Sequence, residues 1–284
     1  MSTLRGLLAG DGPLLVPAAH DALTARLIEA AGFTAYGVGG ASLSATQLAL
    51  PDVGLQSFGE YRDGVARIME GAARLPVMVD GENGFGDAKA VTRTVRTFEA
   101  MGVGALAFED LVFPPMLSRP PGLITRAEID GKLTAALAAR RSEEMLIIGR
   151  TDAAHVAGLD EALIRARGFE SLGVDAVLAP GLADLDAYKR LRDAVSVPLV
   201  AVVVAGSPWF APSVEQLRSV GVQAALYPAA ILIRVAGAIR EGIDAIRSGD
   251  LTAPSGFGFR DLAEALRTSD WAAVDAAGMP GASA

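Results

Sequence analysis

Acidic side chains follow apolar stretches in several parts of this sequence. The segment VMVDGENGFGD (77–87) places Asp80 and Glu82 at the end of an apolar run, two residues apart and therefore on the same side of an extended chain. Glu109 ends a second apolar run, and Asp52 lies in the segment LPDVG. Any one of these acids alone would be read as a solvated loop residue. Four of them gathered at one place would repel one another unless a cation lay between them.

The kind of cation follows from the ligand types that the chain offers. The sequence contains no Cys and only two His residues, so a thiolate site and a three-His zinc site are both excluded. Carboxylate oxygens select a hard divalent ion, and Mg²⁺ typically keeps several water molecules while touching one or two carboxylates. The four acids therefore predict a Mg²⁺ site, with Mn²⁺ as an alternative.

Arg150 adds a positive charge to this set. It ends the apolar run LIIGR, and an Arg in such a position usually needs an anion, for which its planar fork suits a carboxylate. Two glycine-rich segments do not fit phosphate-binding loops: GENGFG lacks the Lys and Ser/Thr of a P-loop, and GVGGAS lacks the spaced third glycine of a dinucleotide loop. We therefore expect Arg150 to bind a small substrate that carries a carboxylate.

These residues require a framework that brings them together. Eight short runs are apolar on both faces, which is typical of buried parallel strands. The expected strands are 14–19, 35–40, 76–81, 105–110, 146–152, 176–180, 198–204 and 224–229. Amphipathic stretches between them predict helices, so we expect a (β/α)₈ barrel, with an open doubly wound sheet as the alternative. In a barrel, catalytic groups come from the carboxyl ends of the strands and the loops that follow, where the charged residues above lie.

Composition limits the partners. The chain has 284 residues, 51% of them hydrophobic, and a net charge of −8, which argues against nucleic acid because phosphates need a basic face. The N-terminus is a poor signal peptide, and no stretch approaches the ~20 uninterrupted apolar residues of a membrane span. We expect a cytoplasmic protein that binds neither nucleic acid nor a membrane.

Several segments together resemble the phosphoenolpyruvate mutase/isocitrate lyase superfamily. They are LPVMVDGENGFGDAKAVTRTVRTFEAMGVGALAFED, IIGRTDA, PAAHDALTARLIEAAGFTAY, LALPDVG and ALYPAA, and the similarity covers about residues 10–248. The resemblance implies a (β/α)₈ barrel, often with the eighth helix exchanged between subunits of a homodimer or homotetramer. It also implies chemistry on C–C or P–C bonds of 2-oxo acids or their hydroxy precursors, through a pyruvate enolate stabilised by Mg²⁺.

The resemblance also implies roles for individual residues. Asp80 would be the direct metal ligand, and Asp52, Glu82 and Glu109 would hold the water molecules of the metal. Arg150 would clamp the substrate carboxylate. Arg150, Glu109 and Asp52 would thereby take part in catalysis.

The segments next to these residues partly depart from the family pattern. Backbone N–H groups around Gly39, Gly40 and Ala41 would bind the substrate carboxylate, and Gly39-Gly40 replaces the usual Ser-Gly, as expected in oxaloacetate-decarboxylase-like members. Family lyases carry a Lys-Lys-Cys-Gly-His loop after the fourth strand, whose Cys is the general acid, but residues 111–122 read LVFPPMLSRPPG. That loop also lacks the Lys and Asn of a phosphonate-forming mutase. The half of the site that recognises the rest of the substrate is therefore expected to be apolar.

We interpret the chain as a Mg²⁺-dependent carbon–carbon lyase or decarboxylase that acts on a 2-oxo or 2-hydroxy acid with a small or apolar far end. Two alternatives remain: a phosphonopyruvate-type mutase or hydrolase on the same barrel, and a non-catalytic barrel that binds an oxoacid. Residues 1–248 are expected to form the barrel domain. Residues 249–284 are expected to form a C-terminal helical extension with a flexible tail, which is either exchanged between subunits or forms a short cap.

Overall fold

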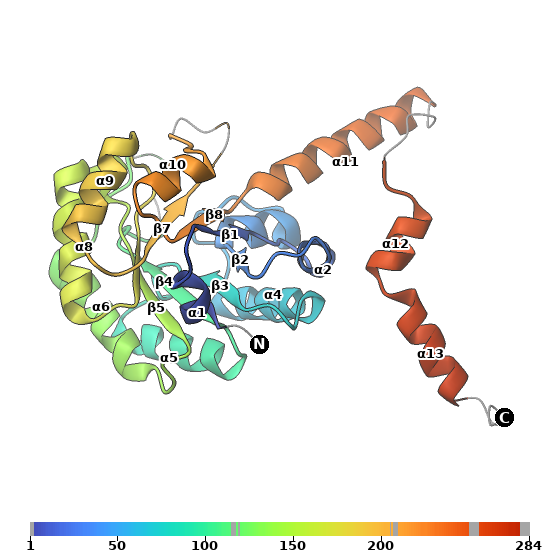
Figure 1. The fold of residues 1–284 in the computed structure, drawn as a ribbon, viewed down its shortest axis with the longest axis horizontal. Coiled ribbons are helices and arrows are strands. Elements are labelled where there is room, and N and C mark those ends of the chain that lie inside the picture. The colour runs from blue at the N-terminus through green and yellow to red at the C-terminus, as the bar shows by residue number, and fades with distance from the viewer. Residues whose placement is uncertain are drawn as a thin grey trace.

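Eight parallel strands form the centre of the structure (Figure 1). The computed structural model describes residues 3–114, 118, 120–204, 206, 210–249 and 256–278. The strands are β1 (Leu14–Pro17), β2 (Tyr36–Val38), β3 (Val77–Asp80), β4 (Ala105–Glu109), β5 (Leu146–Arg150), β6 (Ala176–Leu178), β7 (Leu199–Val202) and β8 (Ala224–Tyr227). They pair in the order β1-β8-β7-β6-β5-β4-β3-β2. The ring closes between β1 and β2, where the Ala19 N–H donates to the Gly37 carbonyl over 2.9 Å. The predicted (β/α)₈ barrel is confirmed.

Helices precede, connect and follow the strands. They are α1 (Leu4–Leu8), α2 (Ala22–Ala30), α3 (Gly40–Leu43), a π-helical turn η1 (Ser44–Leu48), α4 (Phe58–Gly71), α5 (Ala88–Ala100), α6 (Arg126–Ala139), α7 (Ala153–Val156), α8 (Leu159–Leu172), α9 (Leu185–Ala194), α10 (Val214–Ser219), α11 (Ala230–Ser248), α12 (Phe259–Ala265) and α13 (Thr268–Gly278). Short polar side chains begin several of them: Asp87 accepts hydrogen bonds from the backbone of Lys89 and Ala90 at the start of α5. Local sequence therefore sets where α5 starts, directly after the loop that carries the acids.

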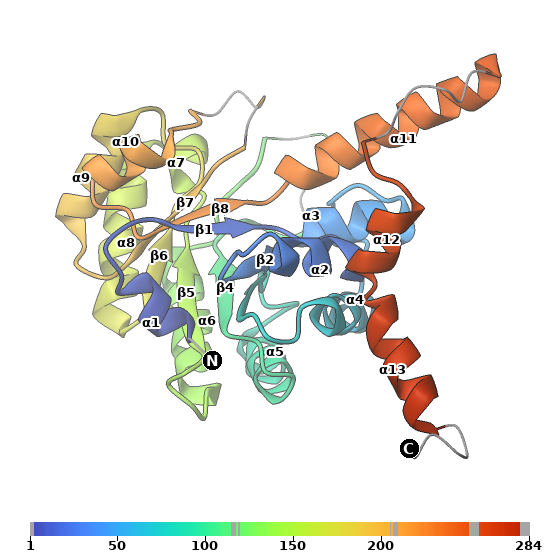
Figure 2. The same cartoon turned by 45° about the vertical axis from the view of Figure 1, so that its right-hand side comes forward.

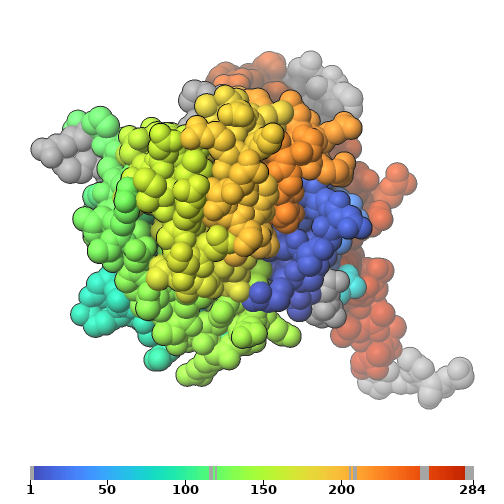
Figure 3. Space-filling view, turned by 60° about the vertical axis from the view of Figure 1, so that its left-hand side comes forward, coloured from blue at the N-terminus to red at the C-terminus, as the bar shows by residue number. Residues whose placement is uncertain are grey.

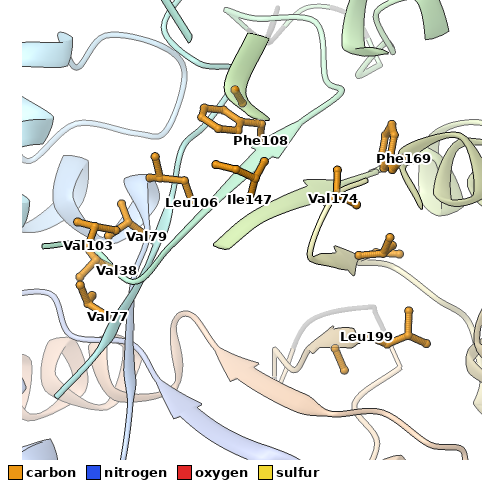
Figure 4. Packing of buried hydrophobic residues seen from close by; sticks show 14 of the residues in the cluster. Val38, Val77, Val79, Val103, Leu106, Phe108, Ile147, Phe169, Val174 and Leu199 are labelled. Atoms are coloured by element: carbon orange, nitrogen blue, oxygen red, sulfur yellow. The ribbon is translucent and has the colours of Figure 1, made fainter. Parts of the chain in front are cut away.

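Successive side chains of each strand point to opposite faces of the sheet, so the core has an inner and an outer layer. In β4, Ala105 and Ala107 point into the barrel, whereas Leu106 and Phe108 pack against the surrounding helices. Figure 4 shows this outer layer, in which strand residues meet helix residues such as Phe169. Each buried Leu or Phe contributes roughly 1.5–3 kcal/mol of transfer free energy. The rigid ring formed in this way fixes the positions of the strand ends that carry the site.

The amino ends of the strands are closed by α1 and by a charge cluster around Asp175, whose side chain is largely buried. Leu4 of α1 belongs to the interior layer. Beside it, Asp175 accepts hydrogen bonds from Arg5 over 2.6 Å, from Arg140, and from the Ile147 N–H over 2.8 Å. This cluster lies at the end of the barrel opposite the acids described above.

The C-terminal helices leave the barrel. Figures 1 and 2 show α11 projecting outward from β8, whereas α12 returns to contact α2. Figure 3 shows the packed surface of α8, α9 and α10, with the C-terminal helices behind it. No residue of α11, α12 or α13 is buried, yet Arg267 pairs with Glu29 of α2. The division at residues 248 and 249 stays a prediction. Among the helices that the structure describes, none has the length and apolar character needed to cross a membrane.

Candidate active site

A pocket of about 100 Å³ lies at the carboxyl ends of β3, β4 and β5. Its walls are formed by Asp52, Glu82, Glu109, Leu111, Val112, Phe113 and Arg150. Four of the five predicted charged residues therefore share one pocket, and the fifth, Asp80, is in contact with Arg150. The structure brings together acids that are separated by up to 57 positions along the chain, from residue 52 to residue 109.

Arg150 is the centre of this charge cluster. It ends β5 directly beside Glu109 in the register of the sheet. Its Nη1 atom lies 2.6 Å from Asp80 Oδ2 and 3.0 Å from Glu109 Oε2, while Nε and Nη2 donate to the two oxygens of Asp152 over 2.9 and 3.1 Å. Burial alone would lower the pKa of Arg150, but Asp152, Glu109 and Asp80 outweigh it and hold this pKa well above its usual range. Arg150 is therefore a permanent, oriented cation.

A turn connects Asp80, which contacts Arg150, to Glu82 of the pocket wall, and this corrects our expectation of an extended chain. Glu82 has φ +52°, in the left-handed region, and its N–H donates to Asp80 Oδ1 over 3.0 Å. The Glu82 carbonyl in turn accepts from the Glu109 N–H over 2.9 Å, and the hydroxyl of Tyr61 donates to the Asp80 carbonyl over 2.6 Å. A non-glycine residue in this conformation is unfavourable, and such strain gathers at functional sites.

The segment after β2 meets the Glu82 carboxylate. Gly39 precedes α3, and Gly40 and Ala41 form its first turn, where N–H groups have no partner within the helix. A Cβ atom on Gly40 would overlap Glu82 Oε1, so only glycine allows this approach. The predicted substrate-binding backbone thus lies in direct contact with one of the predicted metal-site acids.

Gly40→Ala is expected to lower kcat/KM by roughly 10- to 100-fold, because the obstacle is the end of a side chain and Glu82 rather than the backbone will move. The melting temperature should stay within a few degrees of wild type. Gly131→Ala in α6 is the matched control, since its added methyl group meets nothing within 4 Å. Steady-state kinetics and thermal melts of both variants test this. Wild-type kinetics for Gly40→Ala would show that the Glu82 position does not matter.

The acids of the pocket carry more negative charge than Arg150 can balance. Burial, followed by repulsion from Asp80, raises the pKa of Glu82 well above its usual range. Burial raises the pKa of Glu109 to about 8 despite the opposing effect of Arg150. Asp52 keeps a solvent-exposed edge, and its pKa is raised by partial desolvation and then by the charge of Asp80. Additional positive charge would relieve all three shifts.

This donor set fits a hard divalent cation. All the charged donors are carboxylate oxygens, which Mg²⁺ and Mn²⁺ prefer. In the described part of the chain, no three His, Asp or Glu side chains are arranged to hold a metal together. Direct metal binding by Asp80, with Asp52, Glu82 and Glu109 holding its water molecules, therefore stays a prediction.

The far side of the pocket is apolar. Leu111, Val112 and Phe113 line it, and the ring of Phe113 packs on Gly54, where a Cβ atom would lie 3.0 Å from it. The loop after β4 therefore folds over the loop after β2 that carries Asp52. Of the predicted apolar loop 111–122, residues 115–117 and 119 lie outside the described residues.

Two residues that position the charged side chains of the site were given no role from the sequence. Asp152 binds Arg150 with both oxygens, and the only available signal was an acid two positions after a strand-ending Arg. Tyr61 lies in α4 with a fully buried ring, so in the sequence it resembles an ordinary core residue. Burial and then the charges of Glu82 and Asp80 raise the pKa of Tyr61 well above its usual range. Tyr61 therefore stays a neutral hydrogen-bond donor to Asp80.

Sequence comparisons identify relatives over most of the chain. The phosphoenolpyruvate phosphomutase family model matches residues 4–247. An oxaloacetate decarboxylase from Bradyrhizobium sp. strain BTAi1 is 35% identical over 247 residues, which cover 87% of this chain and 84% of that protein. A 2,3-dimethylmalate lyase from Eubacterium barkeri is 32% identical over 252 residues, covering 88% and 87% of the two chains.

Solved structures agree with this relationship. An oxaloacetate acetylhydrolase in complex with the inhibitor 3,3-difluorooxalacetate matches with a TM-score of 0.91 and 26% identity, over 98% of this chain and 97% of that one. A phosphonopyruvate hydrolase in complex with oxalate and Mg²⁺ matches with a TM-score of 0.85 and 28% identity, over 96% of each chain. The chain therefore belongs to the phosphoenolpyruvate phosphomutase family.

Proposed function

We propose that this protein is a Mg²⁺-dependent carbon–carbon lyase or decarboxylase that acts on a small 2-oxo or 2-hydroxy acid, with Mn²⁺ able to replace Mg²⁺. Its relationship to an oxaloacetate decarboxylase and a 2,3-dimethylmalate lyase makes it a carbon–carbon lyase. The observation that carries the rest is the pocket itself, where several carboxylates surround one oriented Arg beside an apolar wall. Oxaloacetate-like acids fit this arrangement with the fewest additional groups.

The acids of the pocket would bind the metal, whereas Arg150 and the apolar wall would bind the substrate. Asp80 would contact the metal, and Asp52, Glu82 and Glu109 would hold its water molecules. When bound, Mg²⁺ supplies positive charge that stabilises the negative charge developing on the 2-oxo oxygen as the neighbouring bond breaks.

Arg150 would orient the substrate carboxylate. Its Nη1 donor now faces Asp80 and Glu109, and this donor would be available to the substrate if these carboxylates held a metal instead. The N–H groups of Gly40 and Ala41 would bind the same carboxylate. Phe113 and Val112 would exclude water from the breaking bond and favour a small or apolar substituent there.

Release of pyruvate from a panel of acids tests the proposal. We expect turnover of oxaloacetate or a 2-alkylmalate in Mg²⁺, and loss of at least about 100-fold of that rate in EDTA, with recovery when Mn²⁺ is added. Oxaloacetate also decarboxylates without enzyme in Mg²⁺, so reactions without protein must be subtracted.

Two results of these assays would favour a different function. Turnover of phosphonopyruvate alone would favour a hydrolase or mutase like the structural relative. Binding of oxalate and Mg²⁺ without turnover of any acid would leave a non-catalytic barrel that binds an oxoacid.

Metal binding should depend on pH through Glu109. Without metal, the folded protein keeps the Glu109 proton up to a pKa of about 8, whereas the unfolded chain releases it near 4.5. The folded state therefore binds more protons between these values, and the free energy of unfolding falls as the pH rises from 4.5 to 8. Mg²⁺ binding must displace this proton at lower pH, so its affinity should rise with pH.

Thermal melts with and without Mg²⁺ measure this effect. The rise in melting temperature on adding Mg²⁺ should be larger at about pH 9 than at about pH 6. Glu109→Gln should remove the part of the pH dependence in EDTA that comes from Glu109 and leave the part that comes from Glu82 and Asp52. An equal Mg²⁺ effect at both pH values would contradict the raised pKa of Glu109.

For assembly and location we propose a cytoplasmic homodimer or homotetramer whose C-terminal helices are exchanged between subunits. In support, the side chains of Ile233, Ile239, Ile243 and Ile246 in α11 are all more than half exposed, which is unfavourable in water. A single-chain mass by light scattering would exclude this assembly.

A further inference from the structure

A buried carboxylate lies directly beneath the active site and belongs to no step of the proposed chemistry. Asp110 follows Glu109 at the end of β4, and its side chain is fully buried. It accepts hydrogen bonds from Thr151 Oγ1 over 2.7 Å, from the Asp152 N–H over 2.8 Å, and from Arg165 Nη1 over 3.2 Å. Two of these three donors belong to the segment that follows Arg150.

Arg165 of α8 extends the contact to the loop after β4. Its Nη2 atom donates to the Ile124 carbonyl over 3.0 Å, and the Ile124 N–H donates to the Asp110 carbonyl over 2.9 Å. Its Nε atom donates to Glu161 over 2.7 Å, which holds the guanidinium from the outer side. The Asp110–Arg165 pair thus connects the two ends of the loop after β4, which leaves the barrel at Asp110 and rejoins it at Ile124.

Both segments held by this pair contribute to substrate binding. Asp152, whose N–H is held by Asp110, binds the guanidinium of Arg150 with both carboxylate oxygens. The loop that rejoins at Ile124 begins with the residues that form the apolar wall, including Phe113. The buried pair is therefore linked to Arg150 through a single residue, Asp152, and Asp110 lies three residues before Phe113 of the pocket lining.

We propose that the Asp110–Arg165 ion pair is a positioning element for substrate binding, which orients Arg150 through Asp152 and anchors the two ends of the loop after β4, at Asp110 and at Ile124. The assignment of substrate contacts rests on the proposed function. A buried ion pair adds little net stability compared with apolar residues of the same volume, so its presence calls for another explanation. Its hydrogen bonds lead to the site: a tilt of the Arg150 fork would lose bidentate geometry, and misplacement by about 1 Å costs of the order of 100-fold in rate.

The opposite end of the barrel provides a matched control. Asp175 also has a largely buried carboxylate that accepts from Arg side chains, one of them half exposed, and from one backbone N–H, that of Ile147, and none of these partners lines the pocket. Asp110→Asn and Asp175→Asn are the same chemical change at the two ends of β5. A difference in KM or in oxalate affinity between these two variants would therefore reflect where the acid lies in the barrel, because both variants lose one carboxylate charge.

The test compares Asp110→Asn, Arg165→Met and Arg165→Lys with Asp175→Asn. KM and the dissociation constant for oxalate in Mg²⁺ should both rise at least about 10-fold in Asp110→Asn and Arg165→Met, with partial rescue in Arg165→Lys. Asp175→Asn should leave both constants within about twofold of wild type. Hydrogen exchange should accelerate at the Asp152 and Ile124 amides in Asp110→Asn, and at the Ile147 amide instead in Asp175→Asn.

If the wild type binds oxalate, KM and the oxalate dissociation constant decide whether the proposal holds. Unchanged KM and oxalate affinity in Asp110→Asn, at a loss of melting temperature like that of Asp175→Asn, would show that the pair serves stability alone and would overturn it. If the wild type neither turns over an oxoacid nor binds oxalate, the proposed function has failed. Hydrogen exchange then decides the positioning role by itself, and unaltered exchange at Asp152 and Ile124 would overturn it.

Discussion

Asp80→Asn should lower kcat by roughly 1,000-fold, equivalent to about 4 kcal/mol of lost transition-state stabilisation, while the barrel stays folded. Asn keeps the shape of Asp and can still accept the hydrogen bond from the Glu82 N–H through its amide oxygen. It loses the negative charge that now faces Arg150 at 2.6 Å and that would contact the metal. The affinity for Mn²⁺ should fall together with kcat, which distinguishes loss of the metal from a local distortion.

Asp87→Asn is the control for this change. Asp87 lies seven residues further on and caps α5, and Asn caps helices as well as Asp. The control should keep wild-type rates and Mn²⁺ affinity. If Asp80→Asn turned over substrate at the wild-type rate, or bound Mn²⁺ with unchanged affinity, Asp80 could not be the metal ligand and the proposed mechanism would fail.

The framework of the site could be predicted because its signal is local. Eight apolar runs with glycine or polar residues between them specify buried parallel strands, and the eight observed strands all lie within the predicted ranges. Once the strands form a ring, their carboxyl ends must meet at one rim. The side-by-side register of Glu109 and Arg150 follows from two strands that each end in a charged residue.

The connections between these residues could not be predicted because their signals are not local. The turn that gives Glu82 its positive φ depends on contacts with Glu109 and with the backbone at Gly40. The Asp110–Arg165 pair joins positions 55 residues apart. In the sequence, Arg165 is one of several charged residues on an amphipathic helix, and nothing there separates it from the exposed ones.

Removing the charge of Arg150 should weaken substrate binding and also lower the stability of the protein, and only the stability should respond to added Mg²⁺. Arg150→Met should raise KM by about 100-fold, since a bidentate, charge-assisted contact to the substrate carboxylate is lost. In EDTA the free energy of unfolding should fall by roughly 3–5 kcal/mol, because Asp80, Glu109 and Asp152 lose the cation that they share. Mg²⁺ should restore part of this stability without restoring KM.

Arg150→Lys separates the two roles of the residue. Lys keeps the charge near the three acids, so the protein should be more stable in EDTA than Arg150→Met. It cannot reproduce the planar fork that binds both oxygens of Asp152, so KM should remain at least about 10-fold above wild type. Calorimetry in EDTA and in Mg²⁺, together with steady-state kinetics, measures both effects. If Lys restored KM fully, charge alone would bind the substrate, and the orientation of Arg150 by Asp152 would have no part in recognition.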